Sequence, residues 1–492
     1  MSLDEIILIT YILTMTVLLF FASHGLVMLF YHKKYIKNVP TSGKEQSDQS
    51  VTIQLPLFNE KYVAERLIDS VCKIEYPKDK LEIQVLDDST DETVQIVADI
   101  VKQKQSEGFD IVQIRRVNRV GFKAGALKEG LGKAKGELIA IFDADFVPSP
   151  DFLKKTLRYF TNSNIGMVQS RWEHLNEDYS VLTRIQALAL NGHFVMEQPI
   201  RNRAGFFINF NGTGGVWRKE CIEDAGNWHD DTITEDLDLS YRAQLKGWKF
   251  VYLRDYTTPA ELPSEMNALK AQQYRWTKGA IETAKKLLPK IWGSKVPLRI
   301  KLQSTFHLTN NIVFPFILLV GILNVPLIFI KNSGPYEIFF NLMSVFIIAF
   351  ISSFLFYLYA QKDVYKDWRQ KIALFPIFMA GSMGFAVNNS KAVIEGLLDR
   401  KSEFVRTPKF KIVEKSDSIV SNTKYLSKTK LDSTVIVEII LALYCLIGVF
   451  ASIYFMELAA LPFQLMFFSG FAMVAALSIK HSYNHGRETN NG

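Results

Sequence analysis

The sequence predicts an α/β domain inserted between membrane-spanning helices. Residues 51–259 alternate short β-rich runs with helical patterns, which favours a mostly parallel sheet with helices on its faces. Apolar runs long enough to cross a bilayer lie before and after this part. The chain has 492 residues, of which 48% are hydrophobic, so it can hold both a domain and a membrane part.

The first apolar run, residues 6–31, predicts an N-terminal membrane span over 1–31. It begins after two acids, Asp4 and Glu5, and lacks a clear small-residue cleavage site, so we do not expect a signal peptide. Basic residues follow it directly: His32, Lys33, Lys34 and Lys37. By the positive-inside rule, the next part of the chain is cytoplasmic. Residues 32–50 are a polar linker to a cytoplasmic domain over 51–278.

Five β-rich runs and one clear helical pattern open this domain. Apolar residues at helical spacing predict a helix over 60–73. The expected strands are 51–55, 81–86, 111–115, 138–142 and 166–169.

Two carboxylates follow the strand at 138–142. Ligands of an open α/β sheet gather at the carboxyl ends of its strands. Asp143 and Asp145 are one residue apart, so in extended chain they lie on the same side. Such a pair suits a hard divalent cation, Mg²⁺ or Mn²⁺, which in turn binds phosphate oxygens. The alternative is an acidic turn that caps the next helix.

Polar groups at two earlier strand ends and one helix start suit a nucleotide. Phe58 can stack on a nucleobase and Glu60 can accept a base N–H, although ordinary turn and capping chemistry also explains them. Asp87 and Asp88 are adjacent acids that can contact a nucleoside or face the metal. Lys123, in a glycine-rich helix start, can pair with a diphosphate as a point charge.

Two later motifs suit an acceptor and a base. The run 210–215 is too rich in glycine for regular structure, and such loops hold ligands on a rigid scaffold. The run 234–238 begins a helix with three acids, one of which can serve as general base for a hydroxyl group. For Glu235 and Asp238 the alternative is the ordinary preference of acids for a helix N-terminus.

The run Gln272-Gln-Tyr-Arg-Trp276 precedes a basic amphipathic pattern. Trp276 offers a flat face for a sugar ring, and Arg275 can bind phosphate through two N–H groups. The pattern over 279–301 predicts an amphipathic helix beside the bilayer, with an ordinary surface helix as the alternative.

Taken in order, these motifs resemble the processive, membrane-embedded family 2 glycosyltransferases, which include the cellulose, hyaluronan and chitin synthases. The runs Leu86-Asp-Asp-Ser-Thr-Asp91 and Gly125-Ala-Leu-Lys-Glu-Gly130 look most like the plant cellulose-synthase-like enzymes that make mannan or glucan backbones. The resemblance covers residues 51–409. It implies a glycosyltransferase-A type fold for the cytoplasmic domain and an integral membrane helical bundle around it.

The resemblance also implies a role for each matching residue. Asp236 would be the general base, and Asp143 and Asp145 would carry Mg²⁺ or Mn²⁺. The nucleotide sugar would be held by Phe58, Glu60, Asp88 (or Asp87) and Lys123. Acceptor and diphosphate would contact Gln169, Phe210, Asn211, Gly212, Thr213, Glu235, Gln272, Arg275 and Trp276. The run 404–409 resembles the cellulose synthase gating loop, with Arg406 in place of Val, and would bring Thr407 and Lys409 to the substrate.

Apolar segments resume after the domain. We expect two spans within 302–360, a cytoplasmic or re-entrant part over 361–433, two spans within 434–480 and a polar tail over 481–492. The segment 372–394 is interrupted by glycine, asparagine and lysine and is flanked by basic stretches, so we expect it to be re-entrant. A simple span is the alternative.

The function predicted from the resemblance is inverting transfer of a hexose from GDP-mannose or UDP-glucose to a growing β-linked polysaccharide, with export across the membrane. The alternatives are a glycolipid synthase acting on ceramide or diacylglycerol, and an inactive glycan-binding or transport subunit. Expected partners are the sugar donor, a glycan or lipid acceptor, the bilayer and accessory export subunits. Net charge is +7 without a long basic run in the first half, so we expect no nucleic acid partner. A bacterial inner membrane with a cytoplasmic catalytic domain is the expected location.

Overall fold

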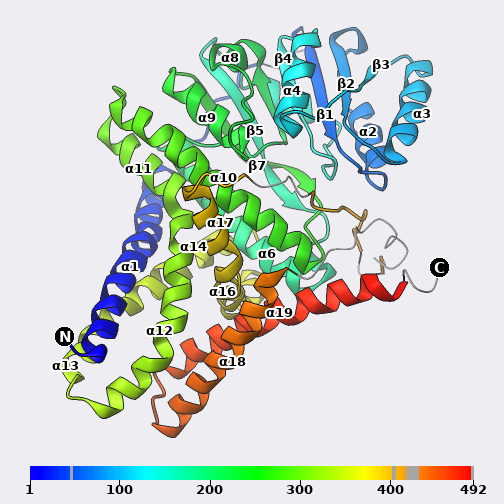
Figure 1. Ribbon diagram of the computed structural model, residues 1–492. Coiled ribbons are helices and arrows are strands. Elements are labelled where there is room, and N and C mark those ends of the chain that lie inside the picture. The colour runs from blue at the N-terminus through cyan, green and yellow to red at the C-terminus, as the bar shows by residue number, and fades with distance from the viewer. Residues whose placement is uncertain (45–47, 402–405, 415, 418–431, 489–492) are drawn as a thin grey trace.

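The computed structural model describes residues 1–44, 48–401, 406–414, 416–417 and 432–488. It has a sheet-containing domain at one end and a bundle of long helices at the other, with the helix α10 (Met266–Gly293) lying between them (Figure 1).

The domain is built on a seven-stranded mixed sheet with the order β3-β2-β1-β4-β6-β5-β7. The first four strands are mutually parallel, β6 is antiparallel to both its neighbours, and β5 and β7 are parallel. Because β1 to β4 run in the same direction, their carboxyl ends meet at one edge of the sheet. The strands are β1 (Val51–Leu57), β2 (Leu81–Asp87), β3 (Asp110–Ile114), β4 (Leu138–Ile141), β5 (Ile165–His174), β6 (Gly215–Arg218) and β7 (Lys249–Ala260).

Helices cover both faces of the sheet, as side-chain alternation along the strands requires. In β4, Leu138 and Ala140 pack on one face, and Ile139 and Ile141 on the other. The first face is covered by α2 (Ala64–Cys72), α3 (Thr93–Ser106) and α5 (Phe152–Leu157). The second face is covered by α4 (Phe122–Lys133), α8 (Lys219–Asp224) and α9 (Glu235–Leu245). A short 3-10 turn, η1 (Lys78–Lys80), precedes β2.

The five strands expected from the sequence are present, and two more complete the sheet. β6 is only four residues long and starts at the end of the glycine loop, so its pattern is too short to be read. β7 pairs with β5 through a register shift that leaves Arg254, Asp255 and Tyr256 out of the ladder. Such irregularity breaks the two-residue alternation that identifies a strand.

A layer of helices joins the domain to the long apolar helices, and its place at the membrane interface stays a prediction. The basic amphipathic helix expected over 279–301 is longer toward its N-terminus and ends earlier, because α10 begins at Met266 and stops at Gly293. The 272–276 motif therefore lies on α10 itself. The other members are η2 (Glu177–Tyr179), α6 (Val181–Asn191), the π-helical η3 (Gly192–Glu197) and α7 (Gln198–Arg203).

The membrane part contains five described stretches of helix that are long and apolar enough to cross a bilayer. They are Leu3–Tyr35, Leu298–Ser333, Glu337–Lys362, Ser433–Tyr454 and Leu461–Ser482. Their elements are α1 (Leu3–Tyr35), α11 (Leu298–Thr309), η4 (Asn310–Ile312), α12 (Val313–Ser333), α13 (Glu337–Met343), η5 (Ser344–Phe346), α14 (Ile347–Lys362), α18 (Ser433–Tyr454) and α19 (Leu461–Glu488).

The segment expected to be re-entrant is a bent pair of helices. A break separates Trp368–Gly384 from Ala386–Leu397, which meet at 46°. At the break, Gly384 packs directly on the backbone of Gly470, where a Cβ atom would lie only 2.3 Å from the carbonyl oxygen. This geometry suits either a broken span or a re-entrant loop, so the re-entrant path stays a prediction. The elements are α15 (Trp368–Ile372), α16 (Phe375–Gly384) and α17 (Ala386–Leu397).

Candidate active site

A cavity of about 250 Å³ lies at the sheet edge where the parallel strands end. It is enclosed by the strand-end loops, the start of α9, the helix α10 and the segment 406–409. Most of the residues predicted from the sequence line it: Phe58, Glu60, Asp88, Lys123, Asp143, Asp145, Asn211, Gly212, Glu235, Asp236, Gln272, Arg275, Trp276, Thr407 and Lys409.

Four predicted residues are not among the described residues that line the cavity and make their contacts outside it: Asp87, Gln169, Phe210 and Thr213. The Asp87 carboxylate accepts hydrogen bonds from Ser89 N and Gln113 Nε2, so Asp88 is the acid of this pair that faces the cavity. The hydroxyl of Thr213 accepts from Asp143 N, and Gln169 donates to Thr213 O. Phe210 is fully buried and packs edge-on against Trp217.

The two acids predicted to bind a metal each contact a lysine. Lys123 Nζ lies 2.5 Å from Asp143 Oδ1, and Lys409 Nζ lies 2.6 Å from Asp145 Oδ2. Burial raises the pKa of Asp143 against the opposing charge of Lys123. Burial lowers the pKa of both lysines, but the facing carboxylates outweigh it and leave each pKa raised. The carboxylates thus already attract cations here, and two hard oxygen donors at a strand end fit Mg²⁺ or Mn²⁺.

The predicted base, Asp236, sits in the first turn of α9. Its Oδ1 accepts from Leu237 N at 2.8 Å. Its Oδ2 faces the loop residue Gly212, whose φ is +81° and whose added Cβ would lie 3.1 Å from that oxygen and 3.3 Å from Lys123 Nζ. Glycine is therefore required at this position. Burial, with repulsion from Glu235, raises the pKa of Asp236 to about 7, which suits a group that accepts a proton near neutral pH.

Helix α10 closes the cavity on the side opposite the strands. Its Gln272, Arg275 and Trp276 all line the cavity. Arg275 donates to Thr407 Oγ1 at 2.9 Å, and burial lowers its pKa to about 10, so it stays charged at neutral pH. A charged guanidinium beside the Asp143 and Glu235 carboxylates suits a leaving diphosphate.

Two arginines beside Asp88 and Phe58 were not predicted from the sequence. Arg116 donates two hydrogen bonds to the Asp88 carboxylate, and its Nε lies 2.9 Å from Oδ1. Arg119 stacks on the Phe58 ring, its guanidinium carbon 3.2 Å from the ring centroid. The signal that could have found them is the basic run after the third strand, 115–119.

The segment 406–410 lies against the strand-end loops. Arg406 donates to Asn59 O and pairs with Glu60 at 3.4 Å, while Lys409 also donates to Glu261 O. Burial raises the pKa of Glu60 to about 8 despite these cations. Of the predicted gating-like loop 404–409, residues 404 and 405 lie outside the described residues.

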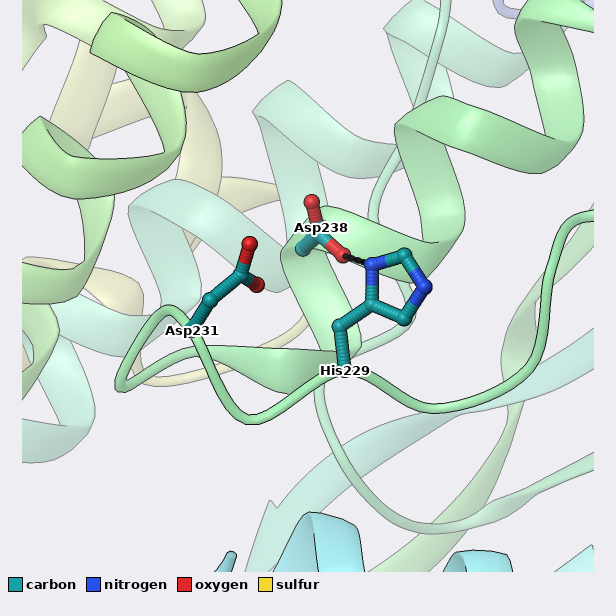
Figure 2. A group of neighbouring side chains, drawn as sticks. All are labelled: His229, Asp231 and Asp238. Carbon is teal, nitrogen blue, oxygen red and sulfur yellow. Dashed lines mark ion pairs between the residues drawn. The ribbon is translucent and has the colours of Figure 1, made fainter.

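A second group of possible metal ligands lies behind the cavity, where His229, Asp231 and Asp238 converge (Figure 2). The ammonium group of Lys286 contacts all three side chains, at 3.2 Å from His229 Nδ1, 2.6 Å from Asp231 Oδ1 and 2.9 Å from Asp238 Oδ1. Arg242 Nε adds a contact of 2.7 Å to Asp238. The cluster is thus an ion-pair network that fastens α10 to α9.

Replacing Lys286 by Met should destabilise the protein by about 1–3 kcal/mol, because it removes the ammonium group 2.9 Å from the buried Asp238 Oδ1 and leaves that carboxylate paired with Arg242 on its other oxygen. Thermal unfolding in one detergent, compared with wild type, measures the change. Lys290→Met, an exposed position on the same helix, is the control. An unfolding temperature equal to that of the control would contradict the role of the network.

The comparisons with known proteins bear on this site. A model of the family described as glycosyltransferase like family 2 matches residues 48–279, which include the strand-end acids, Asp236 and the 272–276 motif. Residues 48–279 thus match a family 2 glycosyltransferase domain. Glucomannan 4-beta-mannosyltransferase 2 of Arabidopsis thaliana is 43% identical over 281 residues, which are 55% of this chain and 53% of that protein. Glucomannan 4-beta-mannosyltransferase 1 of Cyamopsis tetragonoloba is 40% identical over 301 residues, 58% of this chain and 57% of that protein.

These findings confirm the resemblance to plant mannan and glucan synthases that the motifs indicated. The chain spans about half the length of the curated relatives it matches. Among solved structures, the mannosyltransferase PcManGT from Pyrobaculum calidifontis, in complex with GDP-Man and Mn²⁺, has a TM-score of 0.54 and 19% identity over 79% of this chain and all of that one. This likeness confirms the glycosyltransferase-A type fold of the domain.

Proposed function

We propose that the chain is an inverting hexosyltransferase that moves mannose from GDP-mannose to a growing β-linked polysaccharide. One observation carries the proposal: the Asp236 carboxylate, the Asp143 and Asp145 pair and the Arg275 guanidinium line one cavity. Mannose is favoured over glucose from UDP-glucose because the relatives are named glucomannan 4-beta-mannosyltransferases and PcManGT was solved with GDP-Man.

The reaction assigns one task to each group. Asp236 removes the proton from the acceptor hydroxyl as the oxygen attacks the anomeric carbon. The bond from that carbon to the diphosphate oxygen breaks, and the diphosphate leaves with the electron pair. Arg275 stabilises the negative charge that develops on it. A divalent cation held by Asp143 and Asp145 would supply further charge stabilisation there. Attack from the face opposite the leaving group inverts the anomeric centre and gives a β-linkage.

A second cavity in the membrane part supports export of the product. It has a volume of about 900 Å³ and is lined by α1, α12, α14, α16 and α19. Polar groups in the membrane part mark pathways more often than packing. Those along this cavity include His24, Asn310, Asn324, Lys331 and Glu457.

The same cavity is also compatible with one alternative function, transfer of the sugar to ceramide or diacylglycerol. Most of its remaining lining is aliphatic or aromatic, which suits an acyl chain as well as the faces of sugar rings. The inactive-subunit alternative has less support, because every acid that the reaction needs lines the catalytic cavity.

Purified protein with Mn²⁺ or Mg²⁺ should be offered radiolabelled GDP-mannose and UDP-glucose in separate reactions. We expect label from GDP-mannose in an alcohol-insoluble polymer that a β-mannanase digests. Label in a chloroform-soluble product would replace this proposal with the glycolipid one. Absence of transfer from either donor, with GDP binding intact, would count against both.

The pH profile of transfer offers a further expected result. A protonated Asp236 cannot accept the hydroxyl proton, so kcat/KM should rise with pH and level off once the carboxylate is ionised. Burial raises the Asp236 pKa to about 7. We therefore expect the pH midpoint of the rise in kcat/KM to lie well above the usual pKa of an aspartate and no higher than about 7. A rate that is flat from pH 5 to 8 would contradict this assignment.

The location is also a proposal. The basic residues in the last turn of α1, His32, Lys33 and Lys34, support a cytoplasmic catalytic domain. A bacterial inner membrane remains the compartment favoured by the sequence, with accessory export subunits as possible partners. Protease accessibility of the domain in sealed vesicles tests the orientation.

A further inference from the structure

A chain of hydrogen bonds joins the catalytic cavity to the membrane cavity. Asn211 lines the first cavity and Glu197 lines the second. His193 contacts both, with Nε2 3.1 Å from Asn211 Oδ1 and Nδ1 3.1 Å from Glu197 Oε2. Along this chain, one imidazole ring stands between the site of the proposed reaction and the path proposed for its product.

The backbone that carries this pair is unusual. His193 and Glu197 belong to η3, a π-helical stretch between α6 and α7. Such segments are rare and often mark functional sites. Residues four apart on a helix share a face, so both side chains can bond on the same side of η3. Both are largely but not fully covered, with 25% of the His193 side chain and 17% of the Glu197 side chain exposed.

The neighbours of Asn211 fix the direction of the bonds. Asn211 Oδ1 also accepts from Asn209 Nδ2 at 2.7 Å, and Asn211 Nδ2 donates to Gln169 Oε1 at 3.2 Å. The oxygen of the amide therefore faces His193, and Nε2 must donate to it. Nδ1 faces a carboxylate and must donate as well. The ring satisfies both contacts as an imidazolium paired with a Glu197 carboxylate.

The charge state of Glu197 agrees with this arrangement. Burial raises its pKa, but the hydrogen bond from His193, followed by the electrostatic effects of His307, His193 and Arg201, outweighs burial and leaves the pKa well below its usual range. An ionised carboxylate offers strong acceptors to neutral hydroxyl groups, and the imidazolium holds it in position.

The surroundings on the membrane side suit a sugar ring. His24 and Asn310 line the second cavity together with Glu197, and the aromatic rings of Phe306 and Tyr357 line it as well. His24 stacks on Phe306, with ring centroids 4.5 Å apart. Aromatic faces beside directional polar groups match the two surfaces of a pyranose, its C–H face and its hydroxyl rim.

We propose that His193 and Glu197 form a glycan-binding subsite at the junction of the two cavities, which holds the acceptor behind its reacting end. The ligand class is a β-linked hexose oligosaccharide, whose hydroxyl groups donate to the Glu197 carboxylate, while His193 holds that carboxylate and Asn211 in place. This inference rests on the proposed polysaccharide transfer and deepens it by assigning an acceptor subsite to these residues.

Titration of the full-length protein in detergent with β-1,4-mannohexaose tests the subsite without requiring turnover. His193→Gln and Glu197→Gln should each raise the oligosaccharide Kd about tenfold or more, because Glu197→Gln removes the charged acceptor of the glycan hydroxyl groups and His193→Gln removes the charged donor that positions it. The Kd of GDP with Mn²⁺ should not change. His32→Gln, a histidine that lines neither cavity and pairs with Asp363, should leave both constants as in wild type. In transfer assays, the acceptor KM should rise while kcat stays within about twofold.

The possible outcomes separate this inference from the proposed function. Unchanged oligosaccharide binding in both variants, or no binding by wild type with GDP binding intact, would overturn the subsite. A parallel rise in the GDP and oligosaccharide constants of His193→Gln would also overturn it, since the residue would then only support the Asn211 loop. Glu197→Gln does not touch that loop and gives an independent reading. Weakened oligosaccharide binding in a protein that transfers no sugar would support the subsite and count against the transferase.

Discussion

Replacing Asp236 by Asn should lower the rate of sugar transfer by about 10²–10⁴-fold, the range typical for loss of a general base. Asn has almost the same shape, and its amide oxygen can still accept from Leu237 N as Asp236 Oδ1 does, so the start of α9 should be preserved. It cannot take up the proton of the acceptor hydroxyl. The measurement is kcat with GDP-mannose at saturating metal, together with the Kd of GDP, which should stay close to the wild-type value.

Asp99→Asn serves as the matched control, because Asp99 lies on the exposed side of α3 and bonds only within its own helix in the described contacts. Glu235→Gln is the informative comparison. Glu235 lies 4.0 Å from Lys123 and lines the same cavity, yet we assign it no proton transfer. If Asp236→Asn kept more than about a tenth of the wild-type rate and Glu235→Gln did not, the base would be Glu235.

The sequence predicted the acids of the site because each follows a strand or opens a helix. Asp88, Asp143 and Asp145 come directly after buried apolar runs, and parallel strands bring such positions to one edge of the sheet. Local pattern was enough to place them. The order of the motifs then indicated a resemblance to the family 2 glycosyltransferases, which the match over residues 48–279 confirms.

Contacts between distant segments could not be predicted in this way. Arg116 and Arg119 reach Asp88 and Phe58 across 28 and 61 positions of sequence, and nothing local marks them as partners. His193 is a further example. Its neighbours Asn211 and Glu197 are meaningful only once the glycine loop packs on η3. A lone histidine in an apolar helical run gives no such signal.

The helix that bears the 272–276 motif shows a second limit. Its expected start, residue 279, marks the point where basic residues become frequent, whereas its observed start, Met266, is set by packing. Lys270 on the added part forms a buried ion pair of 2.7 Å with Glu438 of α18. Lys286 joins the other half to α9. Helix α10 is thus held from both sides, which fixes the place of Arg275 in the cavity.

Replacing Asp143 or Asp145 by Asn should lower the transfer rate about 10²–10³-fold and make the remaining rate insensitive to a chelator. A metal that neutralises a leaving group contributes several kcal/mol, and each 1.36 kcal/mol is a factor of ten in rate. The structure supports this expectation, since each carboxylate already pairs with a positive charge. Lys123 pairs with Asp143, and Lys409 pairs with Asp145. Calorimetric titration with Mn²⁺ in the presence of GDP measures the loss of affinity directly, apart from any effect on turnover.

Asp110→Asn is the control, because its partner Lys135 is exposed and the pair lies at the opposite end of the sheet strands. The two site variants also differ in which lysine loses its carboxylate partner. Asp143→Asn frees Lys123, which keeps its bond to Gly212 O, whereas Asp145→Asn frees Lys409, which keeps its bond to Glu261 O. Each lysine therefore stays in the cavity and can still meet a diphosphate, so GDP should bind both variants without metal. Mn²⁺ binding equal to wild type in both variants would show that the cation is held elsewhere and would remove these acids from the metal site.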